Sequence, residues 1–546
     1  MAGIAQRRVR ISWTSIHEAI KLPNSSSSLI NEDLAPSAPE RRTWTVWDYF
    51  AYWWSEYWSI AVWSTGSSLI SLGATIRDAL LVVLFANVLK VGVVLLNSRA
   101  AATYHVGYPV LARGSFGIYG AYFAILLRSL IGLIWGGVQV YYEGKFLSIC
   151  LRAIFPGWSR IPNSIPKSQH IDIQTMLAFI FAFLLNLPLM MVHPINIRHL
   201  FSVKSVLVPL AALGIVCWAT TANRGVSDDH LVDTSAKESK STSVFAWEIV
   251  AQFNFIVSGA SALFVSIPDL TRYSKTRRSV YGQVLGLPLA HITCSAFGII
   301  TTAAVKEMWG EAYWNPYDLL NGILDRSYTP RARAGVFFAS LAFAFAALGT
   351  TVAGDMIPFA ADVSSLAPRY INIIRGQFLC LFLTLAIVPW HIVATRNGFL
   401  KFLDGYGIFQ GPVLGIMVAD YFLVRRGNWH MSDLFSRERS RLYYYARGFN
   451  LRAFVAFVAG FLLPLPGFVG SFQHMEEGNA ATHMFSLGWV LSFSTGGVVY
   501  LMICWVWRVP GWKEDQDRGF EAQASTARES MEERNYGEKG PTGDPE

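Results

Sequence analysis

DIQTMLAFIFAFLLNLPLMMV, residues 172–192, is almost free of charge, because its only charged side chain, Asp172, stands at the first position. A helix of about 20 apolar residues crosses the ~30 Å hydrocarbon core of a bilayer. Comparable apolar runs lie at residues 47–72, 76–96, 121–150, 200–221, 244–266, 281–304, 334–358, 377–393, 399–424, 453–472 and 484–507. The sequence therefore predicts an all-α integral membrane protein with twelve transmembrane helices.

The composition also points to a lipid environment. Of the 546 residues, 53% are hydrophobic and 15% are charged, whereas soluble domains carry about 25% charged residues. The five cysteines are scattered, without the spacing of a disulfide framework or a metal site. The net charge of +8 comes mainly from Lys and Arg in short loops and tails. That distribution is typical of membrane proteins and indicates a lipid bilayer, not a nucleic acid, as the partner.

The polar residues 1–46 and 509–546 are predicted to be disordered cytosolic tails on either side of a transmembrane domain at residues 47–508. An even number of spans places both termini on one side of the membrane. Arg and Lys gather in the loops after the sixth, eighth and tenth spans, which favours the cytosol for that side. Residues 104–120 contain Pro109 and several glycines, so a re-entrant or interfacial segment is expected there.

Polar side chains inside a span mark candidate sites, because each costs about 2.5–3.5 kcal/mol on insertion scales. Trp135 and Gln139 lie four residues apart in the third span, and thus on one face of a helix. The indole can stack on a flat ring, and the amide can donate to and accept from its edge. The alternative is a packing Trp and a Gln bonded to a neighbouring backbone. His291, in the seventh span, is expected to be a structural histidine rather than a proton relay.

Two carboxylates within the spans, Asp355 and Glu56, are further candidates. Asp355 follows Gly354 and precedes Pro358, where a helix is easily interrupted. Alternatively, it is a salt-bridge partner of Arg128 or a protonated core acid. Alternatively, Glu56 lies near the membrane interface, because Trp and Tyr residues surround it in the sequence.

Seven segments together carry a family resemblance: NEDLAPSAPERRTW (31–44), STGSSLISLG (64–73), YPVLARGSFGIYG (108–120), IWGGVQ (134–139), IPDLTRY (267–273), LAPRYINIIRG (366–376) and GPVLGIMVADYFLVRRG (411–427). In this order they resemble the nucleobase-cation symporter family one, and within it the fungal uracil, allantoin and thiamine permease branch. The resemblance implies a five-plus-five inverted repeat, with core repeats at about residues 47–221 and 244–424, and two extra C-terminal helices. It also implies that the first and sixth helices are broken.

In this family the third-helix Trp stacks on the substrate ring and the Gln one turn later hydrogen-bonds to it, which implies these roles for Trp135 and Gln139. The family's eighth-helix Asn aligns with Asp355. Because an ionised carboxylate only accepts hydrogen bonds, this departure leaves the choice between a neutral lactam and a cationic substrate open.

A second departure lies in the sixth helix, where the family's other stacking aromatic falls at Ala260. Two alternatives remain: the ring is contacted on one side only, or Phe253 or Phe255 completes the ring contacts. The predicted substrate-binding set is completed by small residues at the two helix breaks: Ser59, Ser258 and Gly259.

The coupling ion follows from the same resemblance. Relatives with a sodium site use backbone carbonyls of the broken first helix and hydroxyls of the eighth helix. The matching eighth-helix positions here are Ala346, Gly349 and Thr350, which retain one hydroxyl. A proton is therefore predicted in preference to sodium. The predicted ion-coupling residues are Glu56, Ile60, Ala346, Thr350 and Thr351.

The predicted function is a proton-coupled symporter of the plasma membrane that imports a nucleobase-related heterocycle such as uracil or allantoin. No nucleotide-binding loop of the G-x-x-x-x-G-K-[ST] kind occurs, and no cofactor is predicted. One alternative is a carrier of thiamine or of a nicotinamide riboside-type vitamin. Another is a substrate-sensing transceptor with little transport. An enzyme is not expected, because the polar positions hold no nucleophile–base pair or metal constellation.

Overall fold

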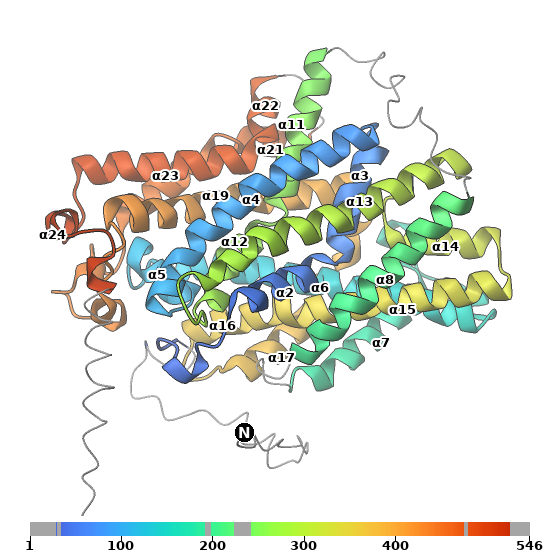
Figure 1. Ribbon diagram of the computed structural model, residues 1–546, viewed down its shortest axis with the longest axis horizontal. Coiled ribbons are helices and arrows are strands. Elements are labelled where there is room, and N and C mark those ends of the chain that lie inside the picture. Colours follow the sequence, from blue (N-terminus) through green and yellow to red (C-terminus); the bar gives the residue numbers. More distant parts are fainter. Residues whose placement is uncertain (1–28, 30–33, 192–197, 223–241, 474–478, 525–546) are drawn as a thin grey trace, which may run out of the picture.

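The computed structural model describes residue 29 and residues 34–191, 198–222, 242–473 and 479–524. Throughout these residues the regular structure is helical, as predicted, and the helices pack into one elongated bundle (Figure 1). Parts of the two predicted tails, residues 1–28, 30–33 and 525–546, lie outside the described residues.

In the described part of the chain, nine helical stretches are long and apolar enough to cross a bilayer. They coincide with nine of the predicted spans. These stretches are α4 (Ile76–Tyr104), α6 (Ala121–Ile154), α7 (Ile173–Leu189), α8 (Arg198–Ala222), α11 with α12 (Thr242–Ser258, Ser261–Thr271), α13 (Gln283–Trp309), α15 with α16 (Pro330–Thr350, Ile357–Leu366), α19 (Arg396–Ala419) and α23 (Gly488–Val506).

The other three predicted spans are each divided into two shorter helices. These pairs are α2 and α3 (Val46–Tyr57, Ile60–Ser71), α17 and α18 (Ile373–Thr384, Pro389–Val393), and α20 and α21 (Leu451–Leu462, Leu465–Gly470). The expected segment at residues 104–120 forms α5 (Tyr108–Phe116), a short helix whose nine residues are all buried. Further short helices are α14 (Pro316–Arg326), α22 (Ala480–Ser486) and α24 (Trp512–Asp517).

Three interruptions in these helices have local causes. Between α2 and α3, Ser59 is extended, and its hydroxyl accepts a hydrogen bond from the Val62 amide at 3.4 Å, which starts the new helix. Helix α11 ends at Ser258 and α12 begins at Ser261, with Gly259 between them, and glycine has the least steric restriction on its backbone. Between α15 and α16 the helix widens into a π-helical turn, η6 (Thr351–Met356). Pro358 follows this turn and has no N–H for the carbonyl of Gly354.

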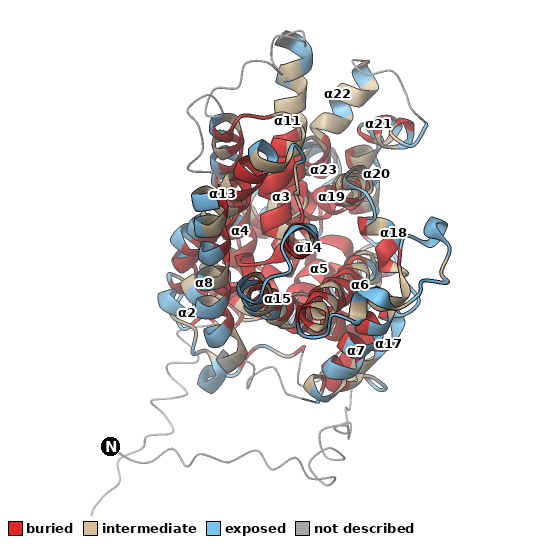
Figure 2. Ribbon diagram, turned by 90° about the vertical axis from the view of Figure 1, so that its right-hand side faces the viewer, coloured by how far each residue is buried: buried red, intermediate tan, exposed pale blue. Residues whose placement is uncertain are grey.

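Helix α13 packs closely against α2, α3, α4 and α8. A Cβ atom on Gly66 would lie 2.8 Å from Ser295, and one on Gly298 would lie 2.7 Å from the Trp63 carbonyl, so glycine sets the α3–α13 distance. The small-residue run of the first span therefore serves helix packing. Around this buried interior the outer helices, including α7, α8 and α17, expose their outward faces (Figure 2).

A buried ion-pair network joins α6 to α12 and α16. The Arg128 guanidinium donates to Asp362 at 2.7 Å through Nε and to Asp269 at 2.5 Å through Nη1, and it lies 4.2 Å from the Tyr108 ring centroid. Arg128 and Asp362 are both almost fully buried. Arg128 is thus paired with these two aspartates and not with Asp355.

Candidate functional site

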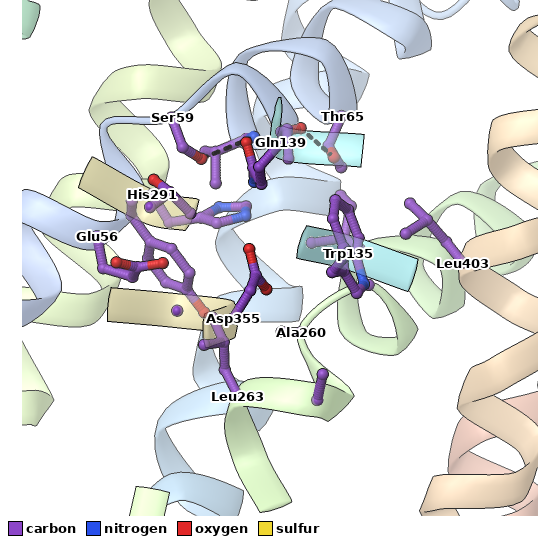
Figure 3. A pocket seen from close by; sticks show the side chains of 18 of the residues that line it. Glu56, Ser59, Thr65, Trp135, Gln139, Ala260, Leu263, His291, Asp355 and Leu403 are labelled. Atoms are coloured by element: carbon purple, nitrogen blue, oxygen red, sulfur yellow. Dashed lines mark hydrogen bonds between the residues drawn. The ribbon is translucent and has the colours of Figure 1, made fainter. Parts of the chain in front are cut away.

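A pocket lies where the two broken helices, α2–α3 and α11–α12, meet α4, α6, α13 and η6 (Figure 3). Its empty volume, which includes the opening to solvent, is about 690 Å³. Trp135, Leu403 and Leu263 belong to its apolar lining. The polar lining consists of Glu56, Tyr57, Ser59, Thr65, Lys90, Gln139, His291, Thr350 and Asp355.

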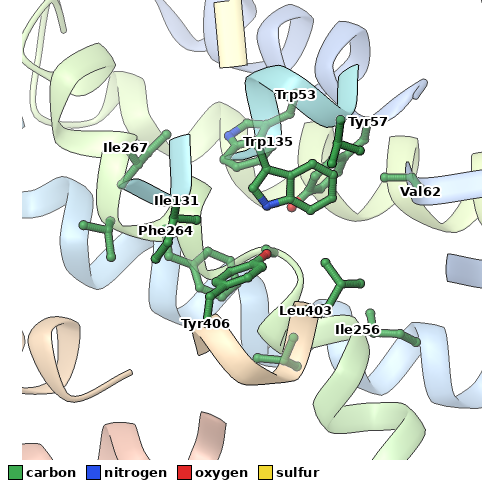
Figure 4. Packing of buried hydrophobic residues seen from close by; sticks show 14 of the residues in the cluster. Trp53, Tyr57, Val62, Ile131, Trp135, Ile256, Phe264, Ile267, Leu403 and Tyr406 are labelled. Carbon is green, nitrogen blue, oxygen red and sulfur yellow. The ribbon is translucent and has the colours of Figure 1, made fainter. Parts of the chain in front are cut away.

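Trp135 and Gln139 both line this pocket from α6, as their spacing predicted. The Trp135 indole packs against aromatic rings of α19, with ring centroids 5.6 Å away at Phe402 and 6.5 Å away at Tyr406. These contacts hold the indole where it lines the cavity. Figure 4 shows Trp135 and Tyr406 among the buried hydrophobic residues. The Gln139 Oε1 atom is buried and has no hydrogen-bond partner among the described residues. This acceptor is therefore unsatisfied within the described part of the chain.

Asp355 reaches the pocket from the π-helical turn η6, a type of turn that is frequent at functional sites. Figure 3 shows it between Glu56 and Trp135, with its carboxylate directed into the cavity. Its Oδ2 atom is buried and has no hydrogen-bond partner in the described part of the chain. Because Arg128 is paired elsewhere, the salt-bridge alternative for Asp355 does not apply.

Glu56, near the end of α2, is buried in the same pocket and does not lie at the surface. Its Oε1 atom would lie 2.9 Å from a Cβ atom on Gly354, so the side chain occupies the space that this glycine leaves. The Oε2 atom has no hydrogen-bond partner among the described residues. Two carboxylates, Glu56 and Asp355, therefore share one enclosed space.

A buried lysine on α8 contacts the predicted ion-coupling region. The Lys204 Nζ atom donates to the Thr350 hydroxyl at 2.6 Å, and that hydroxyl donates to the Ala346 carbonyl at 3.1 Å. Lys204 also lies close enough to Glu56 and Asp355 to act on both electrostatically. The Lys204 nitrogen thus lies at the one hydroxyl retained at the positions that match a sodium site.

The remaining predicted residues fall into two groups. Ser59 and Gly259 line the pocket. Phe255 is buried in the hydrophobic core and does not line the pocket. Four further predicted residues also lie outside the pocket lining. Those four are Ser258, whose hydroxyl donates to the Leu403 carbonyl at 2.9 Å, Thr351, whose hydroxyl donates to the Ala347 carbonyl at 2.9 Å, and the apolar-packed Ile60 and Phe253.

Residues 36–492 match the protein family described as "Permease for cytosine/purines, uracil, thiamine, allantoin". The chain belongs to this family. It is a membrane permease and not an enzyme. It is 34% identical to an allantoin permease of Saccharomyces cerevisiae over 492 residues, which cover 89% of this chain and 77% of that protein.

Two other relatives come from the same yeast. A uracil permease is 31% identical over 89% of this chain and 77% of its own length, and a thiamine transporter is 27% identical over 81% and 73%. Among solved structures, Mhp1, a nucleobase-cation-symport-1 family transporter in a closed conformation with bromovinylhydantoin bound, superposes with a TM-score of 0.71. At 20% identity, covering 91% of this chain and all of that one, this likeness establishes the Mhp1-like fold of the permease.

Sequence reasoning missed two lysines of the permease, Lys90 on α4 and Lys204 on α8. Both lie inside predicted spans, and both are almost fully buried. The rule that singled out Glu56 and Asp355, an ionisable group within an apolar span, applies equally to these lysines and would have found them. His291, expected to be structural, also lines the pocket.

The first prediction concerns Trp135. Trp135→Ala should lower uptake by at least about tenfold, a free-energy difference of ~1.4 kcal/mol, because the mutant loses a stacking surface. Trp135→Phe, which keeps a ring, should retain most of the uptake. The measurement is substrate uptake in a transporter-deficient yeast, normalised to the amount of protein at the cell surface.

Trp505→Ala is the matched control, since the Trp505 side chain on α23 is 75% exposed and lies outside the pocket. It should leave uptake unchanged. Normal uptake by Trp135→Ala would remove Trp135 from the binding site.

Proposed function

We propose that this permease is a proton-coupled symporter that imports a nucleobase-related heterocycle across the plasma membrane, with uracil and allantoin as the first candidates. The observation that carries the proposal is that Trp135, Gln139 and Asp355 meet in one pocket. An aromatic plane with hydrogen-bonding groups beside it fits a flat ring with N–H donors. The yeast relatives supply the candidate substrates.

The proposal includes the finer architecture. Twelve spans would form a five-plus-five inverted repeat with two extra C-terminal helices and both termini in the cytosol. The breaks at Ser59 and Gly259, one in each proposed repeat, support it. In carriers of this type the substrate binds beside such breaks, near the middle of the membrane, where unpaired backbone groups face the cavity.

Lys204 supports the proton as the coupling ion. Sodium binding at the Thr350 hydroxyl would place a second positive charge beside the Lys204 ammonium. Two unit charges 4 Å apart repel each other by about 4 kcal/mol at an effective dielectric constant of 20. Glu56 is the group that would carry the proton, because it is a carboxylate that faces the pocket and belongs to the predicted ion-coupling residues.

A vitamin carrier for thiamine or a nicotinamide riboside-type cation is the second candidate function. The observation in its favour is the presence of two pocket carboxylates, Glu56 and Asp355, which would stabilise a cationic ligand. A transceptor would bind the same ligands with little net uptake.

The second prediction is the test of the proposed function. Yeast cells that lack their own permeases and express the full chain should take up radiolabelled uracil or allantoin. Uptake should increase severalfold as the external medium changes from neutral to mildly acidic, and it should collapse with a protonophore, because proton entry drives it. Replacing sodium with choline should have no effect.

Three other results would contradict this account. Uptake of thiamine alone would favour the vitamin carrier, saturable binding without uptake would favour the transceptor, and a strict sodium requirement would refute proton coupling.

The third prediction separates a neutral from a cationic substrate. Asp355→Asn keeps one acceptor oxygen and adds a donor, so uptake of a neutral lactam should survive or improve. If the substrate is a cation, the loss of a counter-charge should lower uptake by at least about tenfold, ~1.4 kcal/mol. The measurement compares the Michaelis constants of wild type and mutant for uracil, allantoin and thiamine. Unchanged substrate range, affinity and pH dependence would place Asp355 outside the site.

A further inference from the structure

Helices α4 and α13 place a chain of three polar side chains beside the pocket. The Lys90 Nζ atom lies 2.9 Å from His291 Nε2, and the Asn87 amide nitrogen lies 3.0 Å from His291 Nδ1. The Asn87 amide nitrogen also donates to the Val83 carbonyl at 2.7 Å, one turn earlier on α4. All three polar side chains are almost fully buried. This arrangement fixes the position of the Lys90 nitrogen at the pocket wall.

Lys90 retains hydrogen-bonding capacity in this position. If its ammonium donates to His291, two N–H groups remain, and if its neutral amine accepts from His291, two N–H groups also remain. In the described part of the chain, His291 is the one hydrogen-bond partner of the Lys90 nitrogen. The nearby Tyr57 ring, 5.3 Å from that nitrogen, offers a π face and no acceptor of comparable strength. Two donors are therefore available to a ligand.

The pocket also contains buried acceptors that lack donors. Glu56 Oε2, Asp355 Oδ2 and Gln139 Oε1 have no hydrogen-bond partner among the described residues. Within the same residues, no ion pair of 4 Å or less joins Lys90 to either carboxylate. Unpaired polar groups are costly when buried, so a ligand that bridges the donors and the acceptors gains from both. Such a ligand carries N–H groups on one edge and an oxygen acceptor on another.

We propose that Lys90 is a substrate-binding residue that donates a hydrogen bond to a carbonyl oxygen of the substrate, and that His291 positions it. The inference rests on the proposed function and narrows its substrate class to small lactam and ureide rings. These rings alternate N–H and C=O groups, so they match both the acceptors and the donors of the pocket. A ring without an oxygen acceptor leaves Lys90 unpaired.

The fourth prediction tests this contact by exchanging oxygen for sulfur, a weaker hydrogen-bond acceptor. Inhibition of radiolabelled uracil uptake is measured for uracil, 2-thiouracil and 4-thiouracil in cells expressing wild type or Lys90→Met. The wild type should bind one thio analogue at least about tenfold more weakly than uracil, ~1.4 kcal/mol. Lys90→Met should bind uracil more weakly and should no longer distinguish that analogue from uracil. If the wild type takes up allantoin and not uracil, hydantoin and 2-thiohydantoin replace the probes.

Methionine is close to lysine in length and leaves no buried charge, and surface-labelled protein is quantified for each variant. Lys401→Met is the matched control, since Lys401 lies on α19 and bonds to the Ser471 carbonyl outside the pocket. It should keep the wild-type discrimination. His291→Ala should reduce the discrimination without altering the rank of the probes, because Lys90 loses its anchor.

Each contrary outcome has a distinct meaning. If Lys90→Met binds uracil and both thio analogues more weakly by the same factor, or discriminates among them as the wild type does, the proposed role of Lys90 is wrong. The proposed function is not affected by either result. Failure of the wild type to take up either uracil or allantoin would overturn the proposed function and this inference with it.

Discussion

The hydrogen bond between Lys204 and Thr350 is the interaction on which the pocket depends. Two carboxylates, Glu56 and Asp355, lie within a domain surrounded by lipid, where an uncompensated charge is costly. The Lys204 ammonium supplies positive charge from within the chain and joins α8 to α15 at the same time. A metal cation is not required to join these two helices, which agrees with the proposed coupling to a proton.

The shape of the pocket follows from places where helical geometry is interrupted. Ser59 starts α3 after an extended residue, Gly259 separates α11 from α12, and Pro358 follows the π-helical turn that carries Asp355. Irregular backbone at membrane depth is tolerated only where protein or a polar cavity surrounds it. The same interruptions therefore create the cavity and supply polar groups to it, while rigid packing at Gly66 and Gly298 holds α3 against α13.

The sequence predicts the course of the chain better than it predicts the partners of buried polar groups. Apolar length alone located nine helices that the structure describes, and helical spacing placed Trp135 and Gln139 on one face. The partner of a buried charged group does not follow from local spacing, because Arg128 binds Asp362, which lies 234 positions away in the sequence. Lys90 and Lys204 depart from the usual location of lysines in loops, because both are buried within spans. The Ser258 hydroxyl donates a hydrogen bond to the Leu403 carbonyl on a helix far away in the sequence. A local sequence pattern does not reveal this contact.

The most direct test of the role of Lys204 is uptake by Lys204→Ala in proteoliposomes under an imposed proton gradient. The purified full chain and the variant are compared for accumulation of radiolabelled uracil or allantoin, with binding of the same probe measured in parallel. If the ammonium is the fixed positive charge that makes proton coupling possible, the variant should lose accumulation while it still binds the probe. Accumulation equal to that of the wild type would contradict the account.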